Sequence, residues 1–535
     1  MNRSFRVLCA VLALASAASP AWAESIEDRL ERMEREIQEL REELKRERAA
    51  KQTAPAPAPG APATAAASAP PAVAAPATGA ATAPEKESVV ATAVQGVTDR
   101  VKVGGYGSTR FETSTLDDQN TTFTYRRFVL SADAAIAPRM RSYLELEFER
   151  FRELELEKKF GPDEGGLEVE QTVEGTNESE IAFEQAWFDF EVTQGLHTRI
   201  GEVLVPLGRF NLNHDDNEWN LPRRSLVDKG TPVLPVTAAW GELGVGLLGD
   251  LDIGEQGRFT YEGYVVNGAT LDVEFEQIAK TRQGDTAQSI IEAKVEPATG
   301  VFGNDTKDSK ALTGRLAYSP ALGHEVGVSG YWGQYTPDFL AQEDVWSAGF
   351  DGLTGIGPFE LEAEYIYTRF EGISKVARSL ADVAINSESE GEVGDVETEV
   401  EFELANLARA KQGYWIEGRY RFWPSLLDKT PLGHPFDNPQ LIGVVRGEQV
   451  WLNDLVEEVA FSGRQLTAFE EDDRFVNRFT AGLAYRPIPP VVFQLAYEFT
   501  WTNHGDSLSG VTNFLAAGEH EDTNHAVLLG AAFGF

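Results

Sequence analysis

Beyond position 23 the sequence has no cysteine and no hydrophobic run as long as a membrane-spanning helix. Its one cysteine, Cys9, precedes that point, so we expect no disulfide and no cysteine-ligated metal in the rest. A spanning helix needs about 20 consecutive apolar residues, which excludes helical membrane proteins. Positive charge is also scarce, with 47 Lys and Arg against 85 Asp and Glu and a net charge of −38. A nucleic-acid partner is not expected, because phosphate binding requires a basic surface.

Motifs for catalysis and cofactor binding are absent as well. The sequence has no HExxH and no G-x-S-x-G. GVGLLG at 244–249 matches a glycine-rich nucleotide-binding pattern, but Asp250 follows at once and the stretch is predicted to be a strand. His214, beside Asp215 and Asp216, is interpreted as a hydrogen-bonded loop histidine rather than a cation ligand. We therefore expect no enzyme activity, no cofactor and no metal.

The first 23 residues have the features of a secretory signal peptide. Arg3 and Arg6 supply the positive start, VLCAVLALA the apolar centre, and Ala21–Ala23 the cleavage site. The mature chain is therefore predicted to be exported. An exported chain without spanning helices is either a soluble protein or a membrane β-barrel.

Residues 24–50 are predicted to form a coiled coil in the periplasm. Apolar residues recur there at alternating intervals of four and three, at Ile26, Leu30, Met33, Ile37, Leu40 and Leu44. RLERME at 29–34 resembles a short motif of three-stranded coiled coils, which favours a trimer; a dimer and a single helix are the alternatives. Residues 51–100 follow as an Ala/Pro-rich linker, in which 51–84 contain 16 Ala and 8 Pro.

From residue 101 onward, short strands alternate with two kinds of connector. The connectors after even-numbered strands are mostly short turns, and those after odd-numbered strands are mostly long and polar, including a flexible acidic insert at 371–410. An even strand number with all long loops at one end is typical of an outer-membrane barrel. The sixteen predicted strands are 101–113, 122–137, 141–157, 180–192, 196–205, 240–250, 256–267, 309–320, 324–336, 343–352, 357–370, 411–423, 438–452, 472–487, 490–501 and 525–535.

These strands alternate apolar and charged residues. Leu144, Leu146 and Phe148, for example, alternate with glutamates. Sixteen strands enclose a space too wide for side chains to fill, so the charged face is predicted to line a wet lumen, against a sandwich as the alternative. The predicted pore lining is Arg127, Glu145, Glu147, Glu149, Glu360, Glu362, Glu364, Arg419, Arg421, Arg446 and Arg478.

The third long loop, 206–239, differs from the others. Its four prolines and its aromatic residues predict a stiff segment that packs inside the barrel and narrows the pore, with packing over the rim as the alternative. The residues predicted at this constriction are Arg209, His214, Asp215, Asp216, Trp219, Arg223, Arg224, Asp228 and Lys229.

Several motifs resemble the phosphate-selective porin O and P family of Gram-negative outer-membrane porins. They are GGYGS at 104–108, YRRFVLSADAAI at 125–136, RIGEVLVPLGRF…HDDN…LPRRSLVDKG at 199–230, and a last strand ending in Phe535. The resemblance spans roughly 101–535. It implies sixteen-stranded homotrimers, an inward-folded third loop and passive diffusion of small hydrophilic solutes. Phe535 also resembles the signal read by the barrel assembly machinery.

Selectivity does not follow from the resemblance. The family's phosphate preference depends on a ladder of basic residues, whereas here glutamates crowd strands three and eleven while strands twelve to fourteen are rich in arginine. An anion-leaning pore, for phosphate or small carboxylates, and a general or cation-leaning pore both remain open. A structural alternative is a tether, with the coiled coil contacting the cell wall or a periplasmic partner. The remaining expected partners are outer-membrane lipid and lipopolysaccharide.

Overall fold

The computed structural model describes residues 100–535, apart from 116–120, 150–153, 164–165, 176–179, 229–232, 238, 284–285, 302–304, 390–394, 405–406, 463 and 504–521. The predicted signal peptide, coiled coil and linker lie outside the described residues, and so does Lys229. Within the described part, no helix is long and apolar enough to cross a membrane.

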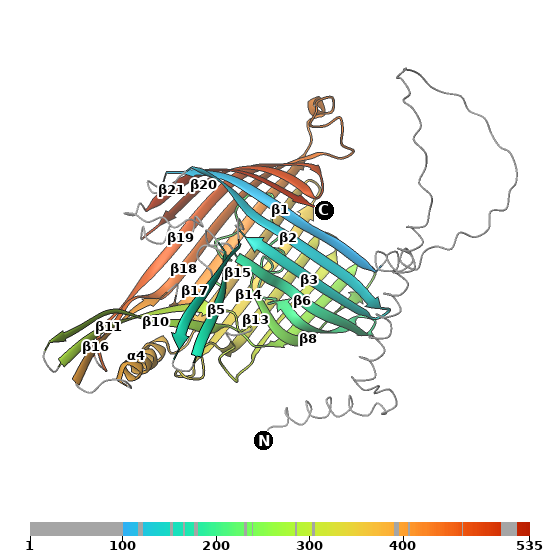
Figure 1. Cartoon of the computed structure of the whole chain (residues 1–535). Coiled ribbons are helices and arrows are strands. Elements are labelled where there is room, and N and C mark those ends of the chain that lie inside the picture. The colour runs from blue at the N-terminus through green and yellow to red at the C-terminus, as the bar shows by residue number, and fades with distance from the viewer. Residues whose placement is uncertain are drawn as a thin grey trace, which may run out of the picture. The chain divides into compact units, whose positions relative to one another are not determined.

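Sixteen of the described strands form one closed antiparallel barrel, which confirms the predicted strand number and barrel architecture (Figure 1). Each strand pairs with the next in the barrel, and the last pairs with the first through Tyr106 to Ser114 and Ala526 to Gly534. The barrel strands are β1 (Val101–Ser114), β2 (Thr122–Ala137), β3 (Met140–Glu149), β6 (Glu180–Thr193), β7 (Leu196–Leu204), β8 (Gly241–Ile253), β9 (Gly257–Val266), β12 (Ala311–Ala321), β13 (His324–Gln334), β14 (Asp344–Ile356), β15 (Phe359–Phe370), β17 (Ala408–Phe422), β18 (Gln440–Ser462), β19 (Gln465–Ile488), β20 (Val491–Thr502) and β21 (Thr523–Gly534).

The predicted long loops contain more regular structure than expected. The loop at 158–179 overlaps a hairpin of β4 (Leu154–Asp163) and β5 (Gly166–Gly175), and the loop at 268–308 contains β10 (Thr270–Gln283) and β11 (Thr286–Ala298). The predicted loop at 453–471 is largely strand, because β18 and β19 continue almost to a tight turn. At the opposite end, the connector between β17 and β18 is long and includes the short helix η2 (Ser425–Leu427).

The prediction of a flexible acidic insert at 371–410 was wrong. This stretch forms the helix α4 (Ile373–Ser389) and the strand β16 (Asp395–Leu404). β16 pairs with β11 and with the outer part of β18, so β10, β11 and β16 make a sheet beyond one end of the barrel, next to α4 (Figure 1). The buried side of α4 belongs to the same apolar cluster as residues of this sheet; its buried residues are Ile373, Val376, Ala377, Leu380, Ala381 and Ala384.

The two faces of the barrel wall have opposite chemistry. Outward-facing Leu144, Phe359 and Leu361 are exposed, whereas the inward-facing Glu145 and Glu147 are buried. The same alternation recurs from strand to strand, since successive side chains of a strand point to opposite faces. Large apolar side chains therefore cover the outside of this barrel, and charged side chains lie inside it.

Candidate pore and its internal segment

Residues 205–240, which we call the internal segment, connect β7 to β8. Its described residues pack against inward-facing side chains of many strands. Three wall glycines make room for it. A Cβ on Gly482 would lie 2.5 Å from Leu221 of the segment, and one on Gly530 would lie 2.9 Å from Pro222. A Cβ on Gly413 would lie 3.0 Å from Val233. The segment therefore contacts the inner faces of β17, β19 and β21, opposite the strands that it connects.

Near its start the segment is bonded to the wall through Arg209. Its Nε donates to Glu362 of β15 at 2.5 Å, and its Nη1 donates to Glu325 of β13 at 2.6 Å. The backbone N–H groups of Arg209 and Phe210 both donate to the Glu364 carboxylate. Three carboxylates from two strands thus hold this end of the segment.

An aromatic cluster continues from this contact. Phe210 stacks on Trp219 with ring centroids 4.5 Å apart, and Trp415 of β17 packs edge-on against Trp219 at 5.6 Å. The Trp219 indole N–H donates to the backbone carbonyl of Asn213 at 2.6 Å. The predicted aromatic anchor is therefore buried between the internal segment and the wall.

His214 is buried and bonded on both ring nitrogens. Its Nδ1 lies 2.8 Å from the Asn211 carbonyl oxygen, and its Nε2 lies 3.1 Å from Oε1 of Glu184 in β6. Burial lowers the pKa of His214, but the carboxylates of Glu184 and Asp215 outweigh this effect and raise the pKa to about 9. His214 thus anchors the segment to β6 as a charged hydrogen-bond donor. Among the described residues, no group of three His, Cys, Asp or Glu could hold a metal ion.

Arg223 lies between two wall carboxylates. Its guanidinium pairs with Glu112 of β1 and, at 3.0 Å, with Glu498 of β20. Its backbone carbonyl accepts a hydrogen bond of 3.1 Å from Arg446 of β18. The neighbouring carbonyl of Arg224 accepts one of 2.5 Å from Arg478 of β19.

The other predicted constriction residues are held in similar contacts. Asp216 accepts a hydrogen bond of 2.6 Å from Ser108 of β1 and lies 4.0 Å from the Arg224 side chain. Asp228 is buried and accepts a hydrogen bond of 2.5 Å from Ser225. These side chains stabilise the segment, and their role at a constriction stays a prediction.

The predicted pore-lining charges form pairs along the wall. Arg127 lies 2.7 Å from Glu147 and 2.9 Å from Glu149, and Gln185 donates to Glu145 at 2.8 Å. The pairs on the opposite side are Arg419 with Glu360, Glu362 and Glu417, Arg421 with Glu360, Arg446 with Glu417, and Arg478 with Glu448. Charges of opposite sign are therefore neighbours. The sequence predicted a glutamate-rich wall facing an arginine-rich wall, and this local pairing makes the separation of positive from negative charge across the pore smaller than predicted.

Arg486 is one of several anchors that the sequence reasoning missed, together with Glu112, Glu184 and Glu325. Arg486, near the end of β19, donates to the backbone carbonyls of Asn217, Glu218 and Trp219 and to the Asn220 side chain, at 2.9–3.1 Å. The sequence did indicate that Arg486 faces inward, because it lies an even number of residues from the inward-facing Arg478 on the same strand. Its bonding to backbone carbonyls, however, depends on where the internal segment packs.

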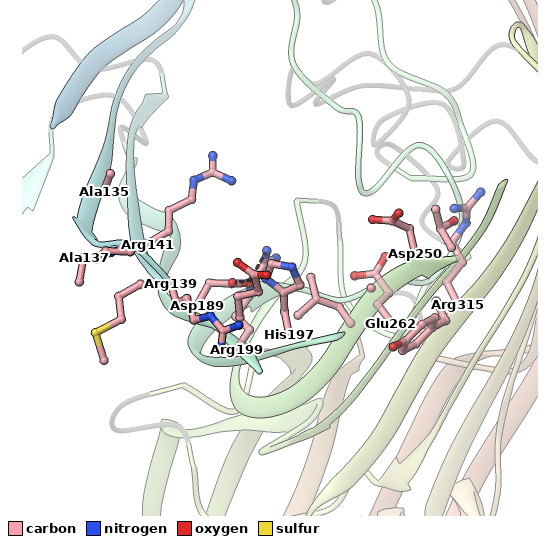
Figure 2. Close-up of a pocket in the computed structure, with 17 residues that line it drawn as sticks. Ala135, Ala137, Arg139, Arg141, Asp189, His197, Arg199, Asp250, Glu262 and Arg315 are labelled. Carbon is pink, nitrogen blue, oxygen red and sulfur yellow. Dashed lines mark hydrogen bonds and ion pairs between the residues drawn. The ribbon is translucent and has the colours of Figure 1, made fainter. Parts of the chain in front are cut away.

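A cavity of about 460 Å³, which we call the vestibule, opens at the short-turn end of the barrel. It is lined by β2, β3, β6, β7, β8, β9 and β12, and no described residue of the internal segment lines it. Figure 2 shows Asp189, His197 and Arg199 gathered at one place, with Glu262 and Arg315 farther along the wall. The lining thus mixes both signs of charge.

Within the vestibule the charges are held by local contacts. Asp189 lies 2.7 Å from His197 and accepts a hydrogen bond of 3.3 Å from Arg199. The Arg199 guanidinium also stacks over the Trp187 ring at 3.8 Å. Arg141 makes two hydrogen bonds of 2.7 Å to Asp133, yet its side chain remains 54% exposed. Arg141 is therefore a charge at the vestibule that water and ions reach.

No family model matches the sequence of this chain. An uncharacterized protein of Aquifex aeolicus is 25% identical over 240 residues, which are 45% of this chain and 45% of that protein. The match thus spans less than half of the relative's length.

Solved structures align over most of the chain at low identity. The anion-selective porin of Comamonas acidovorans is 9% identical over 81% of this chain and 99% of its own, with a TM-score of 0.44. OmpF of Salmonella typhi, in complex with daunomycin, is 10% identical over 81% of this chain and 97% of its own, with a TM-score of 0.44. OmpT of Vibrio cholerae in its trimer form is 10% identical over 82% of this chain and 100% of its own, with a TM-score of 0.41. The strand pairing described above establishes the barrel independently of these alignments.

Proposed function

We propose that the chain is an outer-membrane porin through which small hydrophilic solutes diffuse passively. The observation that carries this proposal is the reversed chemistry of the closed barrel, with exposed apolar side chains outside and charged side chains inside. A soluble barrel buries its apolar face and exposes its charged one, whereas a membrane barrel meets lipid outside and water inside. The sheet of β10, β11 and β16 then lies on the extracellular side, and the short turns lie on the periplasmic side.

The internal segment is proposed to be the constriction of this pore. Its side chains bond to β1, β6, β13 and β15, and arginines of β18 and β19 bond to its backbone carbonyls. Such a framework fixes the segment against the wall, so the passage runs beside it and through the vestibule. Because most interior charges are paired, we propose weak selectivity. A lean toward anions rests on the family resemblance, and a general or cation-leaning pore remains the alternative.

Further parts of the proposal concern the assembly. We propose a homotrimer surrounded by outer-membrane lipid and lipopolysaccharide, with residues 24–50 as a periplasmic coiled coil joined by residues 51–100. A tethering role of this arm would accompany transport. Phe535 follows β21, and its side chain is exposed on the barrel, where we propose that the assembly machinery recognises it.

The proposal is tested by recording single channels of the refolded chain in planar bilayers. We expect an open channel with a small reversal potential in a salt gradient. Arg141→Glu should shift that potential toward cation selectivity, because it reverses an exposed charge at the vestibule. The shift should shrink as ionic strength rises, since salt screens exposed charges.

Arg464→Glu is the matched control. Arg464 is also exposed, but it lies at the tip of the β18–β19 hairpin, far from the vestibule along the strands. It should leave the reversal potential nearly unchanged. A chain that never conducts would contradict the porin proposal, and equal shifts in both variants would show that the vestibule is not on the conduction path.

A further inference from the structure

The internal segment turns acidic side chains, rather than basic ones, toward the water inside the barrel. The Asp215 side chain is 39% exposed, and Glu218 is exposed as well. The described basic side chains of the segment are at most 18% exposed; they are Arg209, His214, Arg223 and Arg224. Because the segment lies inside the wall, ions that pass beside it meet its carboxylates more closely than its cations.

The basic side chains point instead at carboxylates of the wall. Arg209 is paired with Glu325 and Glu362, and His214 is bonded to Glu184. These positive charges are balanced where they lie, so little of their field extends into the lumen.

The charge of Asp215 is balanced less well. The nearest nitrogen of His214, Nε2, is 4.0 Å from Asp215 but only 3.1 Å from Glu184. Burial raises the pKa of Asp215 to about 6, and the carboxylates of Glu184 and Asp216 add to this rise against His214 and Arg127. The surroundings of Asp215 therefore do not fully compensate its negative charge.

A second carboxylate, Glu145 of β3, lies close to Asp215. The two are near enough for Asp215 to act electrostatically on Glu145. Glu145 is held by the neutral amide of Gln185 at 2.8 Å, whereas Glu147, the next inward residue of β3, is paired with Arg127 at 2.7 Å. Asp215 and Glu145, which we call the acidic pair, thus place two negative charges at one point.

The register of β3 and β6 locates the acidic pair next to the vestibule. Arg141 and Asp189 are cross-strand partners that line the vestibule (Figure 2), and Glu145 and Gln185 are partners four residues farther along both strands. Four residues of a strand span about 13 Å. An ion that leaves the vestibule along this wall therefore reaches the acidic pair next.

Glu218, the other exposed acid of the segment, has different surroundings. It lines a second cavity, of about 380 Å³, together with Arg419, Arg421 and Arg486. Three guanidinium groups compensate the negative charge in that cavity. The excess of negative charge is therefore on the vestibule side of the segment.

We propose that the acidic pair makes this pore prefer small cations over anions. The proposal rests on the proposed porin function and selects the cation-leaning alternative. A fixed negative charge beside a narrow aqueous passage with low-dielectric walls raises the local concentration of cations and repels anions. The paired charges elsewhere contribute less, because opposite signs lie side by side.

Permeability ratios of the full chain in planar bilayers, measured in a potassium chloride gradient, test this proposal. We expect the natural chain to pass potassium more readily than chloride. Asp215→Asn and, separately, Glu145→Gln should each lower the potassium-to-chloride ratio about threefold, as estimated for the loss of one charge about 6 Å from an ion in water.

Asp382→Asn is the matched control. It makes the same change at a 58% exposed acid of α4, in the layer beyond the end of the barrel. The ratio should stay the same.

Chemical modification separates charge from folding. Asp215→Cys places a thiol on the segment, and the natural cysteine, Cys9, lies in the predicted signal peptide. In an open channel of this variant, a sulfonate-bearing methanethiosulfonate should raise the ratio, and a trimethylammonium-bearing one should lower it. The same channel is measured before and after, so misfolding cannot produce the difference.

An open channel whose ratio is unchanged in both carboxylate variants overturns this inference, as does a natural channel that prefers chloride. Failure of both reagents to alter the Asp215→Cys channel overturns it as well. Each of these results leaves the porin proposal standing. A chain that never conducts overturns the porin proposal, and this inference with it.

Discussion

Arg223 shows how the interior of this barrel uses charge. Its guanidinium lies buried between Glu112 and Glu498, and its carbonyl accepts from Arg446. Removing the guanidinium would take a cation from two buried carboxylates, of which Glu112 would keep its pair with Arg110 at 2.9 Å. The loss of a buried partner is far more costly than the loss of an exposed one. Substitution of Arg223 would therefore alter the position of the internal segment. Any resulting change in ion selectivity would arise from this movement as well as from the lost charge.

The His214–Glu184 pair predicts a pH-dependent loosening of the internal segment. The pKa of His214 is raised from 6.5 to about 9 by Glu184 and Asp215, against burial and the nearby Arg127. The stabilisation, about 3 kcal/mol, is therefore complete below pH 6.5 and is lost as the pH rises through 9. We expect single-channel noise to increase on going from pH about 7 to about 10, as the histidine loses its charge.

His214→Gln checks the assignment, because glutamine bonds to Glu184 without a charge that titrates. The variant should be noisier at neutral pH and should lack the alkaline step. A step of the same size in His214→Gln would show that another group causes it.

At the scale of elements, α4 and β16 show where sequence reasoning failed. The 371–410 stretch was interpreted as flexible from its acidic residues, although its buried positions 373, 376, 377, 380, 381 and 384 follow the spacing of a helix with one apolar face. The barrel strands were easier to predict, because alternation marks each one. The internal segment was predicted to be stiff from its prolines, but its partners Glu112, Glu184 and Arg486 depend on tertiary packing that no local pattern encodes.

Leu380→Ala should destabilise the outer layer without opening the barrel. Leu380 is 1% exposed and lies in the apolar cluster shared with β11 and β16, so the loss should be about 2–5 kcal/mol. Hydrogen exchange of α4 amides should accelerate, while amides of β1 and β21 keep their protection. Arg378→Ala, on the exposed side of α4, is the control, and it should change exchange little. Unchanged exchange in Leu380→Ala would contradict the packing of α4.

At the scale of the whole molecule, the even strand number and the grouping of connectors predicted the closed barrel. The alternation also predicted which face is exposed, for example outward Phe533 beside inward Ala532. The exact strand ends were less predictable, because the outer parts of β18 and β19 are rich in polar residues. Their extended backbone is supported by pairing with each other and with β16, and by burial of Leu455, Val456 and Val459 in the apolar cluster.

Closure of the barrel is tested with two cysteines. Thr109 and Ala531 are direct partners across β1 and β21, and the natural cysteine Cys9 lies in the predicted signal peptide. Thr109→Cys with Ala531→Cys should form a disulfide on oxidation, visible as a mobility change in a non-reducing gel. Thr109→Cys with Leu529→Cys, two residues out of register, should cross-link much less because diagonal partners are about 7–8 Å apart. Equal cross-linking in both would contradict this register.

The pairing of β1 with β21 has a consequence for how the barrel forms. Until β21 reaches β1, both strands expose a row of unsatisfied backbone donors and acceptors, and such edges pair readily with other chains. The contact joins residues near the two ends of the barrel sequence, so the entropy of closing this loop is lost before the contact stabilises anything. Folding should therefore be slow and prone to aggregation in water. A factor that assists folding of this barrel would act mainly by covering the free edges of β1 and β21 until the two strands pair.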